Sequence, residues 1–146
     1  MATFERHVKV DAPVDKVWSM MTNPATWSQW FPDVDSITGL SAVEPGATFQ
    51  WQDGQKTGSA SIVDVDTNRG LIKVVTTQGD HQVTHTFDLD QSGGFFGMGG
   101  DDTEVKYKRE YQVAGGIVGE FVVGGNPMDM MDVKRTLEKI KRLSQG

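Results

Sequence analysis

The sequence predicts an α+β fold in which an antiparallel sheet of six to seven strands packs against one long C-terminal helix. Between residues 35 and 113, apolar and polar side chains mostly alternate between closely spaced turn signals, which is typical of strands with one buried face. Residues 128–145 lack Gly and Pro and repeat apolar side chains every three or four positions, which is typical of an amphipathic helix. Because such a helix needs a large apolar surface to cover, we expect sheet and helix to share one core.

The composition indicates a single domain, residues 1–146, and argues against several kinds of function. The chain has no Cys, which excludes disulfides and thiolate chemistry. With 14 Lys and Arg against 20 Asp and Glu, the net charge of -6 argues against nucleic acid as a partner. The N-terminus is charged, and no apolar run approaches the about 20 residues of a membrane span. We therefore expect no stable membrane insertion and a cytoplasmic location.

One strand and two short helices are expected before residue 33. Residues 3–10 place apolar side chains at alternate positions and predict a strand. Pro13 follows a capping residue, Asp11, and favours the start of a helix over residues 13–21. A second short helix is expected after Pro24, and three aromatic residues are spaced to share one of its faces: Trp27, Trp30 and Phe31.

Six further strands are expected between turns rich in Gly, Pro, Asn and Asp, and their short connections predict an antiparallel meander. The last two alternate most clearly. One of them places His85 and Phe87 on its inward face, and the other places Tyr107, Arg109 and Tyr111 on its inward face. The expected strands cover residues 35–43, 47–52, 57–66, 70–77, 81–90 and 103–113.

The C-terminal helix is expected over residues 127–144. The run from Gly124 to Pro127 interrupts the helical pattern before it, because Gly and Pro are costly inside a helix. We expect this break to divide a short segment near residues 116–123 from the main helix. It is either a hinge that lets a pocket mouth open or a static kink, and the sequence leaves both open.

Several motifs accompany this order of elements. They are Val10-Asp11-Ala12-Pro13 followed by Val17-Trp18, then Thr22-Asn23-Pro24, the segment from Trp27 to Pro32, the strand 103–113 and the glycine-rich run 115–119. Together they resemble the START-related, or SRPBCC, superfamily, which includes birch-pollen-allergen-like proteins and the polyketide cyclase/dehydrase and lipid-transport family. The resemblance implies a helix-grip fold: a curved antiparallel sheet wrapped around the long helix, with an apolar cavity between them.

The resemblance also implies a START-like ligand-binding domain. The leading hypothesis is non-catalytic binding or transport of a small hydrophobic molecule such as a lipid or polyketide. One alternative is an enzyme of the polyketide cyclase/aromatase type, in which His85, Tyr107 or Arg109 assists proton transfer. Another is a protein-interaction module similar to the cochaperone branch of the superfamily, which would dock through the aromatic loop at residues 93–100 or the outer face of the sheet. We expect no cofactor, and the sequence does not identify a protein partner.

The candidate cavity residues are mostly aromatic, with His85 and Arg109 as two inward polar residues. A buried charge is costly unless it is paired, so Arg109 should meet an acid, carbonyl groups, water or a ligand's acidic head. A purely structural role for either residue is the alternative. The full set is Trp30, Phe31, Phe49, Trp51, His85, Phe87, Tyr107, Arg109, Tyr111, Phe121, Met128 and Met131.

No metal site and no catalytic residue are assigned from the sequence. His81 and His85 would lie about 13 Å apart along one strand, which is too far for both to bind one ion. The chain has no nucleophile elbow, phosphate loop or dinucleotide fingerprint, and the glycines between residues 93 and 100 do not match that last spacing.

Overall fold

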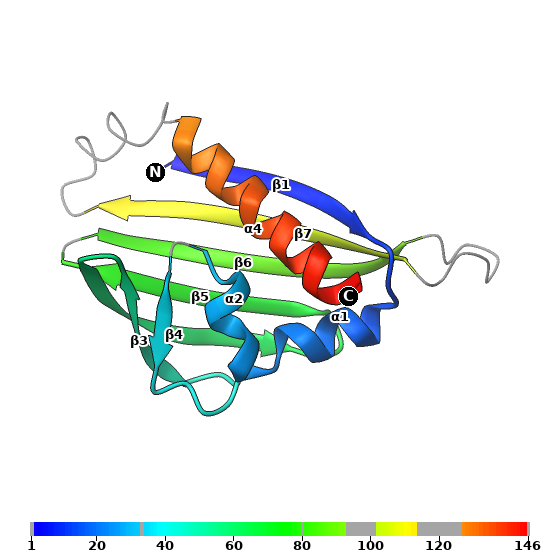
Figure 1. The fold of residues 1–146 in the computed structure, drawn as a ribbon, viewed down its shortest axis with the longest axis horizontal. Helices are drawn as coiled ribbons and strands as arrows, with labels where there is room; N and C mark the ends of the chain where they lie inside the picture. The colour runs from blue at the N-terminus through cyan, green and yellow to red at the C-terminus, as the bar shows by residue number, and fades with distance from the viewer. Residues whose placement is uncertain (1, 33, 80, 93–101, 114–126, 146) are drawn as a thin grey trace.

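The computed structural model describes residues 2–32, 34–79, 81–92, 102–113 and 127–145. Figure 1 shows one curved sheet with the helices on one of its faces, and α4 crossing that face diagonally. The strands are β1 (Ala2–Val10), β2 (Ser36–Thr38), β3 (Thr48–Asp53), β4 (Lys56–Asp66), β5 (Leu71–Gln78), β6 (His81–Ser92) and β7 (Asp102–Val113); the helices are α1 (Val14–Met21), the 3₁₀ turn η1 (Pro24–Thr26), α2 (Trp27–Trp30) and α4 (Pro127–Gln145).

The seven strands form one antiparallel sheet in the order β1-β7-β6-β5-β4-β3-β2. Strands β2 to β7 follow one another as the expected meander, and β1 pairs with the last of them. The α+β prediction, with six to seven strands and two short helices after the first, is confirmed. One boundary was wrong: the strand expected over residues 35–43 is only Ser36–Thr38, and Gly39 follows it with a φ of 88° that an extended strand does not adopt.

Local signals account for the helices near the N-terminus. Pro13 is the N-cap of α1, with an extended backbone conformation, and the hydroxyl of Thr22 donates to Trp18 O at the other end of that helix. The side chain of Asn23 accepts a hydrogen bond from Ala25 N and caps η1. This tight sequence of caps places α2 directly after α1 and brings its aromatic residues onto the sheet.

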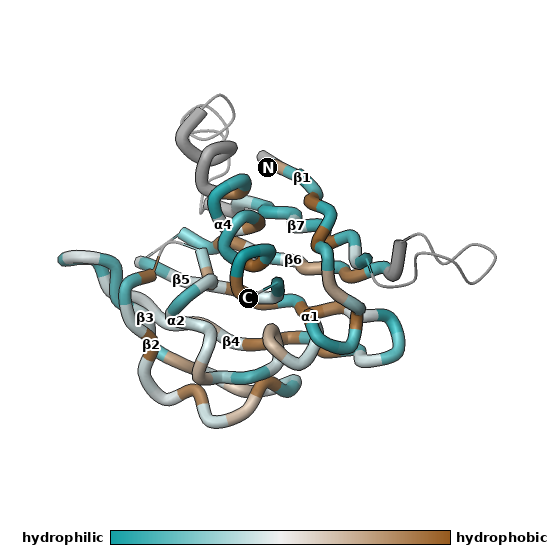
Figure 2. Tube along the Cα trace, turned by 45° about the vertical axis from the view of Figure 1, so that its right-hand side comes forward, coloured by the Kyte–Doolittle hydropathy of each residue, from teal (hydrophilic) through white to brown (hydrophobic). Residues whose placement is uncertain are grey.

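The C-terminal helix begins and ends within one residue of the expected range. Its buried residues Val133, Leu137 and Ile140 belong to the core, and α4 contacts β1, β7, α1 and α2. Figure 2 shows hydrophobic and hydrophilic residues alternating along β1, as a half-buried strand requires. The expected segment at 116–123 and most of the break at 124–127 lie outside the described residues. None of the described helices is both long and apolar enough to cross a bilayer.

Candidate ligand-binding site

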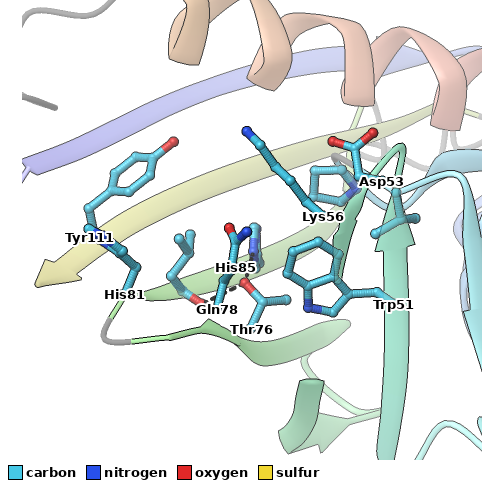
Figure 3. A pocket seen from close by; sticks show the side chains of 11 residues that line it. Trp51, Asp53, Lys56, Thr76, Gln78, His81, His85 and Tyr111 are labelled. Carbon is cyan, nitrogen blue, oxygen red and sulfur yellow. Dashed lines mark hydrogen bonds between the residues drawn. The ribbon is translucent and has the colours of Figure 1, made fainter. Parts of the chain in front are cut away.

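A pocket of about 350 Å³ lies at one end of the sheet, where the β3–β4 and β5–β6 hairpins turn and β7 approaches its last residues. Figure 3 shows Trp51 and Tyr111 on opposite sides of it, with Thr76, Gln78 and His85 between them. The pocket therefore has aromatic sides and a mostly polar middle. Its lining residues are Pro32, Val34, Trp51, Asp53, Lys56, Thr76, Gln78, His81, Val83, His85 and Tyr111.

Trp51 forms one wall of the pocket and is held in place by β4. It lies opposite Gly58 in the register of the two strands, and its indole Nε1 donates to Ser59 O at 3.1 Å. A Cβ atom at Gly58 would overlap the indole ring, so only glycine allows the ring to cover this part of the strand. The half-buried indole is thus a fixed aromatic surface at the pocket.

A chain of hydrogen bonds runs from the pocket into the core. Thr76 Oγ1 lies 3.0 Å from His85 Nε2, and Tyr107 Oη lies 2.5 Å from His85 Nδ1. Arg109 donates from Nε to Tyr107 Oη at 2.9 Å and from Nη1 to Tyr111 Oη at 3.0 Å. The guanidinium carbon also lies 5.6 Å from the Tyr107 ring centre and 5.9 Å from that of Tyr111.

The residues at the centre of this hydrogen-bond chain are buried, and their burial affects the protonation of His85. Arg109 is 1% exposed and His85 is 3% exposed, and the two residues face each other across β6 and β7. Burial, and then the charge of Arg109, hold the pKa of His85 well below its ordinary value of 6.5. His85 is therefore neutral at neutral pH, with a proton on one ring nitrogen and a lone pair on the other.

Four of the predicted cavity residues lie in a tightly packed aromatic cluster beneath the pocket. Phe31 stacks on Trp27 at 5.1 Å and meets Phe49 edge-on at 5.7 Å, and Phe87 stacks on Tyr107 at 4.5 Å. Phe31 also lies 5.3 Å from the His85 ring, which links the cluster to the pocket. Trp30, Phe31, Phe49 and Phe87 are fully or almost fully buried and are not part of the pocket lining.

The structure brings only part of the predicted set to the pocket. Trp51, His85 and Tyr111 line it, while Tyr107 and Arg109 lie behind them in the hydrogen-bond chain. The Arg109 side chain does not reach solvent, because it is 1% exposed and its guanidinium donates to Tyr107 and Tyr111. Three residues are not located: Phe121 lies outside the described residues, and Met128 and Met131 belong to α4 but their side chains are not described.

Sequence reasoning missed most of the polar lining of the pocket, namely Asp53, Lys56, Thr76, Gln78 and His81. These side chains flank turns or lie near strand ends, where polar residues are expected on any protein surface. The usable signal was topological: in a meander, the 53–56 and 78–81 turns fall at the same end of the sheet. Within the described part of the chain, no three His, Asp or Glu side chains are grouped as a metal site.

Comparison with known proteins agrees with this architecture. Residues 1–145 match the sequence profile of the polyketide cyclase/dehydrase and lipid transport family. A comparison with curated protein sequences finds no match.

Several solved structures share the fold. Protein MLL2253 from Mesorhizobium loti has a TM-score of 0.72 and 16% identity, with 97% of this chain and 95% of that one covered. Truncated norcoclaurine synthase from Thalictrum flavum has a TM-score of 0.67 and 15% identity, with coverages of 97% and 91%. DynU16, from the dynemicin biosynthetic locus, has a TM-score of 0.68 and 16% identity; 97% of this chain is covered but only 46% of DynU16, so this chain spans about half its length.

The match of the family profile over almost the whole sequence shows that the chain belongs to the polyketide cyclase/dehydrase and lipid transport family, with the helix-grip fold of the SRPBCC superfamily.

Proposed function

We propose that this protein binds a small hydrophobic molecule in the pocket between Trp51 and Tyr111 and carries it without chemical change. The observation that carries the proposal is the pocket itself, which combines two aromatic side chains with a few polar groups. This combination is typical of small-molecule sites, where aromatic surfaces supply contact area and polar groups orient the ligand. The family description, which names lipid transport beside polyketide cyclisation, supports the same class of ligand.

The state of His85 favours binding over catalysis. A general base needs a free lone pair within hydrogen-bond reach of a substrate proton. Both ring nitrogens of His85 already lie within 3.0 Å of protein hydroxyl groups, on Thr76 and Tyr107. Tyr107 and Arg109, the other two residues considered for proton transfer, do not line the pocket.

An enzyme of the cyclase type is the second candidate. Norcoclaurine synthase from Thalictrum flavum, which has a TM-score of 0.65 and 16% identity to this chain, is an enzyme whose structure was solved with dopamine and hydroxybenzaldehyde. The observation that favours this candidate here is that His85 lies in the pocket lining. Turnover of an aromatic carbonyl substrate that disappears in the His85→Gln variant would establish catalysis and contradict the carrier proposal. The aromatic loop at residues 93–100, considered as a docking surface, lies outside the described residues.

The carrier proposal is tested by ligand binding to the purified protein. Native mass spectrometry of freshly isolated material should reveal a co-purifying small molecule, and titration with anilinonaphthalene sulfonate should give saturable fluorescence. The Trp51→Ala variant should bind this probe at least about tenfold more weakly, because truncating an aromatic contact removes about 1.5 kcal/mol or more.

Trp18→Ala is the matched control. Trp18 is also a half-buried tryptophan, but it lies on α1 near the β4–β5 turn, away from the pocket. The Trp18→Ala variant should therefore bind anilinonaphthalene sulfonate with unchanged affinity. The absence of saturable binding, or equal weakening by both substitutions, would reject this pocket as the ligand site.

A further inference from the structure

We propose that the hydroxyl group of Thr76 donates a hydrogen bond to a carbonyl-type oxygen of the bound molecule, and that His85, Tyr107 and Arg109 position this hydroxyl. The inference rests on the proposed function, because it names the contact that would select the ligand of the same pocket. In chemical terms, it assigns to the site a planar aromatic molecule that bears a ketone, ester or carboxylate oxygen.

Thr76 lies where it can contact both the hydrogen-bond chain and a ligand. It stands on β5 opposite Val83 on β6, is half-buried, and belongs to the pocket lining. Its Oγ1 atom is 3.0 Å from His85 Nε2 and 3.4 Å from Val83 O. In Figure 3, its side chain lies between those of Trp51 and His85, with the contact to the imidazole drawn as a dashed line.

The donor and acceptor roles along the hydrogen-bond chain run in one direction, from Arg109 toward Thr76. The Arg109 guanidinium can only donate, so Tyr107 Oη accepts from its Nε. We assign the Tyr107 proton to the bond with His85 Nδ1, which places the imidazole proton on Nε2. His85 then donates to Thr76 Oγ1, and the Thr76 proton is left to point elsewhere.

The remaining partner of that proton is a poor one. A good O–H···O bond has its oxygen atoms about 2.7–2.8 Å apart, whereas Thr76 Oγ1 and Val83 O are 3.4 Å apart. A ligand oxygen at a shorter distance would therefore replace Val83 O as the acceptor. Because hydrogen bonds in a chain polarise one another, the positive charge of Arg109 at the far end strengthens Thr76 as a donor.

The other hydrogen-bond donors in the pocket are less suited to selecting a ligand by its oxygen atom. Lys56, Gln78 and His81 are exposed, and holding a long exposed side chain against a ligand costs conformational entropy. Thr76 has a single rotatable side-chain bond before its hydroxyl, and that hydroxyl is already held by His85.

The position of the acceptor relative to an aromatic ring follows from the sheet register. Thr76 pairs with Ala60 on β4, two residues from Gly58, and Gly58 lies beneath the Trp51 indole. The donor on β5 and the aromatic wall on β3 are thus separated only by β4, at the same end of the sheet. A ligand whose planar ring packs against Trp51 would therefore have its carbonyl-type oxygen directed toward Thr76.

The test uses two probes that differ only at the acceptor. 2-Acetylnaphthalene carries a carbonyl oxygen, and 2-isopropenylnaphthalene has a CH₂ group in its place and nearly the same shape. Affinities are measured by nuclear magnetic resonance titration, and shifts of the Thr76 and His85 amides locate the binding. Wild-type protein should bind the ketone about two- to tenfold more tightly, as expected for one hydrogen bond.

Three variants identify the source of this preference. Thr76→Val should bind both probes equally, while Thr76→Ser should keep the preference for the ketone. Tyr107→Phe, which changes a residue outside the pocket lining, should reduce the preference for the ketone. The ¹⁵N shifts of the His85 ring should report the Nε2–H tautomer in wild-type protein and its loss in Tyr107→Phe.

The outcomes separate this inference from the proposed function. Binding of both probes with equal affinity to wild-type protein, or a preference that persists in Thr76→Val, would overturn the role of Thr76 and leave the carrier proposal intact. If Thr76→Val does not fold, loss of the preference in Thr76→Ser or an unchanged preference in Tyr107→Phe would overturn it equally. Failure of both probes to bind wild-type protein would reject the aromatic ligand class and the Thr76 contact together; in that case the anilinonaphthalene titration decides separately whether the carrier proposal survives.

Discussion

The indole ring of Trp51 on β3 lies over the Cα atom of Gly58 on β4, its direct partner in the strand register. The same Cα is also close to the backbone oxygen of Thr77 on β5, so an added Cβ would overlap two neighbours. One glycine therefore allows both the placement of a pocket wall and the close approach of β4 to β5.

Gly58→Ala should lower the free energy of unfolding by about 1–3 kcal/mol, because the new methyl group forces the indole and the Thr77 backbone to move. In a Trp51→Leu background the loss should be smaller, since one of the two overlaps is relieved. Urea unfolding of the four proteins in this cycle measures the difference. Ser59→Ala, at the exposed neighbouring position, is the control, and equal losses in both backgrounds would show that the indole does not occupy this place.

Stability should fall in mild acid because of His85. Its pKa is held well below 6.5 in the folded protein, chiefly by burial and then by Arg109, while the unfolded chain takes up a proton near 6.5. Between these two values the unfolded state binds more protons, so the free energy of unfolding decreases as pH falls, by up to about 1.4 kcal/mol per pH unit. Above pH 6.5 this effect is absent.

His85→Gln should remove this part of the pH dependence. Urea unfolding of wild type and variant between about pH 7.5 and pH 5 gives the two slopes. His7→Gln, which removes an exposed imidazole on β1, is the matched control. Parallel slopes for wild type and His85→Gln would mean that folding does not lower the pKa of His85, contrary to its burial beside Arg109.

Arg109→Lys should destabilise the protein by about 3 kcal/mol despite conserving the charge. Arginine donates from two different nitrogens to Tyr107 and Tyr111, and the single ammonium group of lysine cannot reproduce that geometry while buried. Thermal unfolding measures the loss. Arg69→Lys is the control, because its guanidinium is mostly exposed and lies 3.9 Å from Asp88; a similar effect at both sites would contradict the special role of Arg109.

Phe31→Ala should cost about 3–5 kcal/mol, since it removes a ring that packs against Trp27, Phe49 and His85 in the core. Because domains of this kind are stable by only about 5–15 kcal/mol, the variant should unfold at much lower urea concentration. Phe4→Ala, at a half-buried position on the edge strand β1, should cost distinctly less. Similar losses at both positions would place Phe31 outside the tightly packed core.

The alternation of residues along β6 and β7 was enough to predict that His85, Tyr107 and Arg109 point inward. Their contacts were not predictable, because a period of two assigns a face but not a partner. The pairing of His85 with Arg109, and the reach of Tyr107 to the imidazole, depend on the register between two strands and on side-chain rotamers. Register is itself set by turns and by the packing of the whole face.

Local chemistry in the sequence determined the order of elements, the caps of the first helices, the meander and the extent of α4, because turn residues and hydrophobic period act over a few positions. Only the tertiary structure decided which inward aromatic residues fill the core, such as Phe31 and Phe87, and which line a pocket, such as Trp51 and Tyr111. It also decided that Thr76 and Gln78 belong to that pocket. The physical reason is that a cavity is a property of how distant strands and turns close on one another, and no single strand carries that information.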